Sequence, residues 1–139
     1  MKQNTIPPLL PVVPMKACPV ESSMGVLGRK WTLLILRNIG VFKKERFNQM
    51  LDVTPGLTPR VLSMRLQELE RDGFIKRIEE NGTPKIVRWE LTEKGDDTLP
   101  ILVKLVEFGA KWFADKVFED KKPRTIKQLF PQKEARRYL

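Results

Sequence analysis

The segment from Thr58 to Gly73 constrains the fold of this chain more than any other stretch. Threonine is a favoured N-cap residue, and Pro59 suits the first helical position, where its missing N–H costs nothing. Glycine is common just after a helix, so Gly73 predicts that this helix ends near Arg71. The segment therefore predicts a short helix whose two ends are both set by local sequence.

This predicted helix has two unlike faces. At about 100° per residue, Leu66 and Leu69 fall within about 40° of Leu62, and the three form an apolar face for a core. The opposite face carries no carboxylate, so it can enter a groove lined with phosphate. That face consists of Arg60, Ser63, Met64, Gln67 and Arg71.

A second, shorter helix precedes the first. Asn48 is a favoured N-cap for a helix that ends at about Val53, and Pro55 with Gly56 predicts the turn between the two helices. Residues 41–47 are expected to form a short strand that leads into this pair. The arrangement is a helix-turn-helix, in which the second helix usually enters the major groove of DNA.

A β-hairpin pattern follows the two helices. Residues 74–78 and 86–91 are predicted strands, and Asn81-Gly82 is a strong turn signal between them. The loop 79–85 would form a wing. The expected fold class is mainly α with a small β-hairpin (α+β), that is, a winged helix-turn-helix.

Apolar helices flank this unit on both sides. Residues 20–27 and 30–39 are predicted helices that stop near Gly28 and Gly40. A last long helix, interrupted near its start by a glycine and a proline, begins after Thr92. Its apolar stripe is broader than one small domain needs, which favours N- and C-terminal dimerisation helices over packing within the chain. The expected interface residues are Val20, Trp31, Leu102, Leu105, Val106, Phe108, Gly109, Trp112 and Phe113.

Composition divides the chain into an arm, a domain and a tail. Residues 1–17 hold four prolines and predict an extended arm, either disordered or lying on a partner subunit. Residues 18–120 hold the elements described above, and residues 121–139 form a basic tail. The net charge is +9 overall, +5 over residues 29–94 and −3 over residues 95–120. A positive excess placed in this way favours a polyanionic partner, although a solvated basic face that aids solubility is the alternative.

Base reading is expected in the first turns of the helix after Thr58. Arg60 is the best candidate for contact with guanine, and Met64 can touch a thymine methyl group. Basic residues before the first helix of the pair and around the wing suit phosphate or minor-groove contact, although each one alone is equally consistent with a solvated charge. The complete predicted DNA-binding set is Thr58, Pro59, Arg60, Ser63, Met64, Gln67, Lys43, Lys44, Arg46, Lys85 and Arg88.

Residue types argue against other kinds of site. Cys18 is the only cysteine and there is no histidine, so an intrachain disulfide, a zinc site and histidine-based catalysis are excluded. Nothing assembles a nucleophile with a base, so an enzyme is the weakest interpretation, and no metal or cofactor is expected. No apolar run reaches ~18 residues and prolines interrupt any leader-like stretch, which predicts a cytoplasmic protein without membrane contact.

Short motifs also run through the chain in a fixed order. They lie at residues 18–21, 28–36, 46–48, 55–63, 65–66, 68–70, 72–73 and 91–95. Together they resemble the HxlR-type transcriptional regulators, which are MarR-like winged-helix proteins, over roughly residues 18–113. The resemblance implies a homodimer on a pseudo-palindromic operator, with the helix from about Thr58 as recognition helix and the first and last helices as dimer interface. It also implies that Cys18 matches a position at which some relatives sense electrophiles or oxidants.

The chain departs from that family's pattern at three places. Met64 stands where a polar residue is typical, Arg88-Trp89 replaces an acidic–aromatic pair, and the arm and tail are additional.

Cys18 follows Lys16 and lies close to a predicted helix start, and either neighbour would favour a reactive thiolate. The alternative role for Cys18 is packing as a small side chain at the dimer interface.

The leading hypothesis is a dimeric, sequence-specific regulator of double-stranded DNA, controlled by a small molecule or a redox signal. The alternatives are a winged-helix adaptor for proteins and a nonspecific nucleic-acid-binding or RNA-binding protein. An effector could bind between the wing and the dimer helices, lined by Trp31, Phe108 and Trp112. Core packing is the competing explanation for these three aromatic residues.

Overall fold

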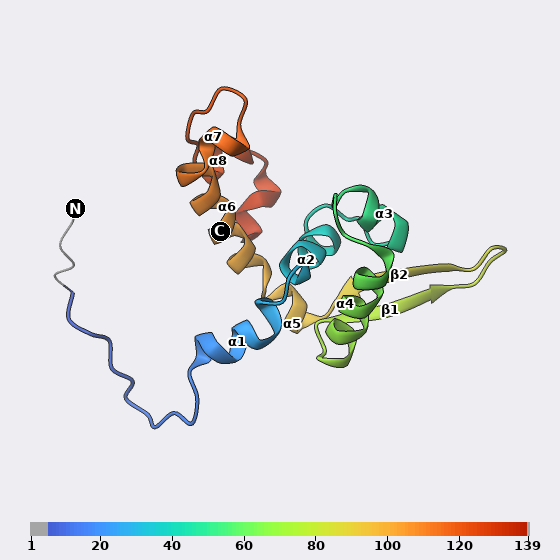
Figure 1. Cartoon of the computed structure of the whole chain (residues 1–139), viewed down its shortest axis with the longest axis horizontal. Coiled ribbons are helices and arrows are strands. Elements are labelled where there is room, and N and C mark those ends of the chain that lie inside the picture. The colour runs from blue at the N-terminus through green and yellow to red at the C-terminus, as the bar shows by residue number, and fades with distance from the viewer. Residues whose placement is uncertain (1–5, 139) are drawn as a thin grey trace.

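The computed structural model describes residues 6–138, apart from the side chains of Arg136 and Tyr138, and it is mainly α with one hairpin (Figure 1). Residues 1–5 of the predicted arm lie outside the described part. The elements in chain order are α1 (Pro19–Leu27), α2 (Thr32–Gly40), α3 (Phe47–Asp52), α4 (Pro59–Arg71), β1 (Ile75–Glu80), β2 (Ile86–Leu91), α5 (Glu93–Asp96), α6 (Leu99–Trp112), α7 (Ala114–Val117), α8 (Ile126–Leu129) and the 3₁₀ helix η1 (Lys133–Tyr138).

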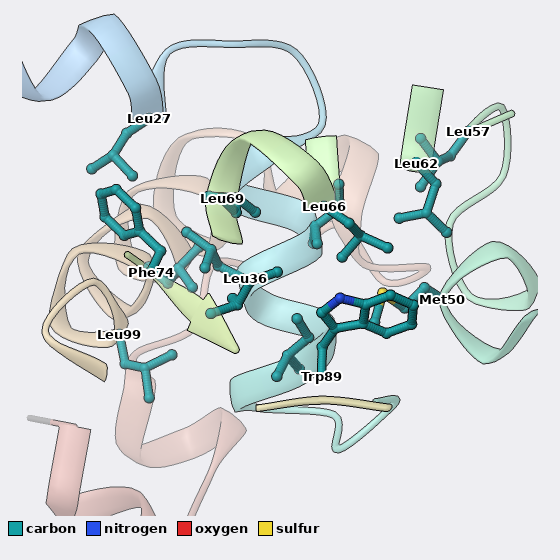
Figure 2. Close-up of a cluster of buried hydrophobic side chains, with 14 residues drawn as sticks. Leu27, Leu36, Met50, Leu57, Leu62, Leu66, Leu69, Phe74, Trp89 and Leu99 are labelled. Carbon is teal, nitrogen blue, oxygen red and sulfur yellow. The ribbon is translucent and has the colours of Figure 1, made fainter. Parts of the chain in front are cut away.

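Helix α2 runs through the centre of the core. Its Leu36 is fully buried among side chains from α3, α4 and β2, including Met50, Leu62 and Trp89 (Figure 2). Leu99 of α6 closes the core at its other end. Burial of this continuous apolar cluster is the main favourable contribution to the fold, at roughly 25 cal/mol per Å² of apolar surface.

Helix α4 forms over the residues predicted for it. The hydroxyl of Thr58 accepts a hydrogen bond from the backbone N–H of Val61 at 3.3 Å, which caps the first turn. Gly73 adopts a φ of 82° just after the last turn, in the left-handed region that favours glycine. The predicted core face is also confirmed, because Leu62, Leu66 and Leu69 are all buried.

The hairpin pairs β1 with β2 in antiparallel register. Ile75 lies opposite Leu91 and Glu80 opposite Ile86, so β1 begins one residue later and ends two residues later than predicted. Trp89 on β2 is buried and packs against Phe47 of α3 with the ring centroids 6.5 Å apart. The hairpin is thus attached to the helices at its base, and its tip extends beyond them (Figure 1).

Two predictions for the segment before α4 are wrong. Residues 41–46 form no strand: Lys43 has a φ of 55°, and the segment reaches the hairpin through a backbone hydrogen bond from Trp89 N–H to the Glu45 carbonyl at 2.9 Å. Asn48 is not the N-cap of α3 either. The helix begins at Phe47, and Gln49 instead accepts a hydrogen bond from the N–H of Arg46 at 3.2 Å, so a side chain inside the first turn satisfies the cap.

The predicted stop at Gly40 is confirmed, and the glycine at this position also has a packing role. Gly40 is the last residue of α2, and a Cβ placed on it would lie 2.7 Å from side-chain atoms of both Leu91 and Leu99. This glycine therefore allows β2 and α6 to approach α2 closely. At its other end α2 starts at Thr32, because Trp31 has a left-handed φ of 78°.

The predicted last helix is divided into α5 and α6. Thr92 does cap α5, accepting from Gly95 N–H at 3.2 Å, and a new helix then begins at Leu99 with Pro100 in its first turn.

After α7 the chain turns back along α6. Arg124 N–H donates to the Ala110 carbonyl at 3.3 Å, and Ile126 of α8 is buried, so much of the basic tail packs on α6.

Candidate nucleic-acid interface

The surface of α4 that faces solvent is the one predicted from the helical wheel. Arg60, Ser63, Met64 and Gln67 are all exposed, whereas the leucines of the opposite face are buried. Thr58 and Pro59 lie exposed at the start of the same helix. The structure therefore brings together six of the predicted contact residues on one rigid element.

The acidic residue Glu68 on α4 is neutralised by arginines. Its carboxylate receives Arg65 at 3.1 Å and Arg29 at 3.3 Å, while the Nε of Arg65 donates to the carbonyl of Lys30 at 2.9 Å. These bonds connect α4 to the α1–α2 connection and fix its orientation. They also reduce the negative charge beside the exposed face.

A groove of about 460 Å³ separates α4 from the hairpin. Ser63, Gln67 and Glu70 line it from α4, and Arg77 lines it from β1. Arg77 lies opposite Trp89 in the strand register, so strand alternation places both on the side of the hairpin facing the helices. Sequence reasoning missed Arg77, although this alternation with the apolar residues of the return strand was a usable signal.

The wing carries its own compensating charges. Lys85 lies 2.6 Å from a carboxylate oxygen of Glu79, and Arg77 also pairs with Glu79. Hydrogen bonds from Lys85 and Arg77 lower the pKa of Glu79, so this carboxylate stays ionised. Lys85 remains exposed, and on DNA a phosphate would take the place of Glu79 as its partner.

Arg88 lies in a different setting from Lys85. It pairs with Glu80 at 2.7 Å and with Glu90, and it lowers the pKa of Glu90 through a hydrogen bond. Because neighbouring residues of a strand point to opposite faces, Arg88 faces away from the side on which Trp89 is buried. The structure thus does not bring Arg88 to the exposed face of α4.

A buried polar contact positions the basic loop before α3. The side-chain amide of Asn38 on α2 is buried and donates to the hydroxyl of Thr54 at 2.8 Å, and the backbone carbonyl of Asn38 accepts from the backbone N–H of Lys44 at 2.8 Å. The loop with Lys43, Lys44 and Arg46 is thereby tied to the turn that leads into α4. Lys43 and Arg46 are exposed and Lys44 is half-buried.

The predicted interface residues divide into two groups. Leu102 is buried in the core of its own chain, and Trp31 and Gly109 are half-buried. Trp31 does not line the cavities next to Phe108 and Trp112, so the structure does not assemble the predicted three-aromatic effector pocket. The exposed group comprises Val20, Leu105, Val106, Phe108, Trp112 and Phe113.

Cys18 is an exposed free thiol at the N-cap of α1. Its carbonyl accepts from the N–H of Ser22 at 2.9 Å, so the residue is held by the first helical turn. Over the part of the chain that the structure describes, no group of three or more His, Cys, Asp or Glu side chains is placed to hold a metal ion. Within the same residues no helix has the length and hydropathy to cross a membrane.

Known proteins share both this sequence pattern and this fold. The family model for the HxlR-like helix-turn-helix matches residues 26–117. The helix-turn-helix transcriptional regulator YdeP of Bacillus subtilis is 35% identical over 97 residues, which cover 70% of this chain and 75% of YdeP. A regulator of the same type from Methanothermobacter thermautotrophicus is 38% identical over 92 residues, covering 66% and 70% of the two chains.

Solved structures of regulators also match the fold of this chain. The redox regulator HypR in its reduced form superposes with a TM-score of 0.63 at 33% identity, over 74% of this chain and 99% of HypR. The reduced regulator YodB from Bacillus subtilis superposes with a TM-score of 0.59 at 28% identity, over 69% and 94% of the two chains.

Proposed function

This chain belongs to the HxlR-like helix-turn-helix family and is a DNA-binding transcriptional regulator of the winged-helix type, and we propose that it acts in the cytoplasm as a homodimer on a pseudo-palindromic operator. Each copy presents α4 to one half-site. The wing and the loop before α3 contact the flanking phosphates. A redox or small-molecule signal controls binding.

The observation that carries this proposal is the exposed face of α4. It combines an arginine with three uncharged side chains that suit base edges, and its neighbouring carboxylate Glu68 is held by Arg65 and Arg29. Arg60 in the first turn is the residue that we expect to make a bidentate contact with guanine O6 and N7. Glu70 lies exposed beside Ser63 and Gln67 on the groove side, and the rest of the face, with Arg60, Met64 and Arg71, carries no carboxylate. A pure protein adaptor has no need of such a partly basic face.

The dimer proposal is supported by a row of exposed apolar residues along α6. Ile101, Leu105, Phe108 and Trp112 follow one another at spacings of four, three and four, and between 44% and 64% of each side chain is exposed. This is the heptad spacing of a helix–helix seam. Two copies paired through it would display two α4 helices, and operator half-sites are then expected about 34–36 Å apart, one turn of DNA.

The signal proposal rests on Cys18 and on two structural neighbours. HypR and YodB are matched by this fold, and HypR is a redox regulator. The exposed thiol of Cys18 can be alkylated, form a mixed disulfide with a small thiol, or join the Cys18 of a second copy. In the last two cases two electrons pass to the oxidant as the S–S bond forms and the two thiol protons leave.

The central test is binding of the purified protein to its own upstream DNA and to a random duplex of equal length, over a range of salt concentrations. A specific complex with two chains per site that persists at moderate salt supports the proposal. Equal and steeply salt-sensitive binding to both duplexes contradicts operator recognition at that locus. Stronger competition by single-stranded RNA than by duplex DNA would favour the RNA-binding alternative.

The redox control is tested with Cys18→Ser. This variant should keep the operator affinity of the unmodified protein, because the residue lies on α1 and away from α4. Oxidants should release the unmodified protein from DNA and leave Cys18→Ser bound, as measured by fluorescence anisotropy of a labelled operator. If oxidants also release Cys18→Ser from DNA, Cys18 is not the residue that senses them.

A further inference from the structure

We propose that the N-terminal arm of one copy lies as a polyproline II helix in the groove between α6 and α8 of a second copy. This inference rests on the homodimer proposed above. It adds an interaction that the paired α6 helices do not contain, and it assigns a role to the two segments that lie outside the winged helix.

The prolines of the arm follow the period of a polyproline II helix. Pro8, Pro11 and Pro14 are separated by three residues each, and this helix has three residues per turn. All three prolines therefore lie along one edge, while Pro7 falls outside that row. Such a segment loses little conformational entropy on binding because its φ angles are already restricted.

The apolar residues beside the prolines have no cover within their own chain. Leu9, Leu10, Val12 and Val13 are between 63% and 99% exposed. Figure 1 shows the arm leading away from α1 rather than returning to the helices of its own chain. Such a run of exposed apolar side chains favours contact with another surface.

The groove between α6 and the tail has the lining that binds such segments. It has a volume of about 590 Å³, with Phe108 and Trp112 of α6 on one side and Pro123 and Gln128 of the tail on the other. Charged side chains also line it, namely Lys104, Glu107, Lys111 and Arg124. Grooves lined by aromatic residues are the usual receptors for proline-rich segments. The indole N–H of Trp112 can donate to a carbonyl of the arm, whose own backbone makes no internal hydrogen bonds.

The lengths of the two partners agree. From Pro8 to Pro14 a polyproline II helix spans ~19 Å at ~3.1 Å per residue. The groove and its continuation run along α6 from Pro100 to Trp112, which is ~18 Å at ~1.5 Å per residue. Residues 6–15 carry no charge, so the lysines that border the groove do not repel them.

A second copy is the expected donor of the arm because of where the arm begins. It joins α1, whose exposed Val20 and Met24 are apolar. The groove shares Phe108 and Trp112 with the exposed apolar row of α6, so in the dimer these two side chains contact the arm on one side and the α6 of the other copy on the other. When the two apolar surfaces pair in a dimer, the start of each arm lies beside the α6 of the other copy. The arm then extends the same interface.

Cross-linking between two differently labelled chains tests the proposal. Both chains carry Cys18→Ser, one also carries Val12→Cys and the other Gln128→Cys, and a short bismaleimide joins thiols that lie close together. The expected result is a covalent heterodimer. Pairing Val12→Cys with Asn48→Cys on α3 is the control and should give none. Combined Pro8→Ala, Pro11→Ala and Pro14→Ala should largely abolish the cross-link, whereas Pro7→Ala should retain it.

Sedimentation of the same samples separates this inference from the dimer itself. A dimer that forms no cross-link above the Asn48→Cys control overturns the arm proposal and leaves the homodimer standing. A monomer in sedimentation overturns both. A chain carrying both Val12→Cys and Gln128→Cys that cross-links only within itself also overturns exchange between copies, because the arm then folds back on its own groove.

Discussion

Helices α4 and α6 are both amphipathic, yet they present opposite chemistry to solvent. On α4 the apolar face is buried and the exposed face is polar or basic. On α6 a narrow apolar side, including Leu99 and Leu102, is buried, and a second apolar row remains exposed. An amphipathic pattern therefore shows only which face joins the core. From the chemistry of the other face we propose the partner, which is a polyanion for α4 and an apolar protein surface for α6.

The largest expected effect comes from the buried side of α4. Leu62→Ala should lower the free energy of unfolding by ~2–5 kcal/mol, because Leu62 is fully buried and its removal leaves a cavity. Met64→Ala, two residues along on the exposed face, should change it by no more than ~0.5 kcal/mol. Urea unfolding measures both. Equal effects of the two substitutions would contradict the assignment of the two faces.

The exposed row of α6 should act on association rather than on folding. Phe108→Ala is expected to raise the dimer dissociation constant about 30-fold, which corresponds to ~2 kcal/mol, the usual threshold for a dominant interface residue. Lys116→Ala, on the adjoining α7 and outside the groove, is the control and should have little effect. Sedimentation equilibrium gives the constants. If the dimer dissociation constant of Phe108→Ala is unchanged, the exposed row of α6 does not form the interface.

The exposed face of α4 should act on DNA binding alone. Arg60→Ala should weaken specific operator binding by ~1–3 kcal/mol and leave binding to random duplex nearly intact, because a base contact is lost. Equilibrium titrations on both duplexes at one salt concentration measure the difference. An equal loss on both would make Arg60 a phosphate contact.

The smallest expected effect is at the wing. Lys85→Ala should weaken binding to operator and random DNA alike, and should reduce the slope of log K against log salt by ~1. Arg88→Ala is an informative comparison, because Arg88 pairs with Glu80 and Glu90 away from the α4 side of the hairpin. A larger slope change for Arg88→Ala than for Lys85→Ala would show that Arg88 exchanges its carboxylates for phosphate.

Local signals predicted α4 and the return strand with the bounds that the structure has. Capping by Thr58, the left-handed Gly73 and the alternation over Ile86–Leu91 all act within a few residues, so they can be predicted without knowledge of distant contacts. The misassigned strand at residues 41–47 shows the limit of this approach. Its residues have extended propensity, but they have no full strand neighbour, and the buried Asn38 holds the loop in another shape.

Residue types and their spacing were enough to predict the fold class, the family, the buried leucines of α4 and the polar character of its exposed face. Which charges are already paired and which apolar residues are covered became known only from the packing of the elements. Arg88, and not Arg77, was predicted to contact DNA, but the strand register places Arg77 on the side that faces the helices. Leu102 and Leu105 were both predicted at the dimer interface, but Leu102 is buried in the core of its own chain. Gly40, at the last position of α2, and Gly95, inside α5, both permit close contact between elements. Each of these outcomes depends on a neighbour far away in the chain, which spacing along the sequence does not record.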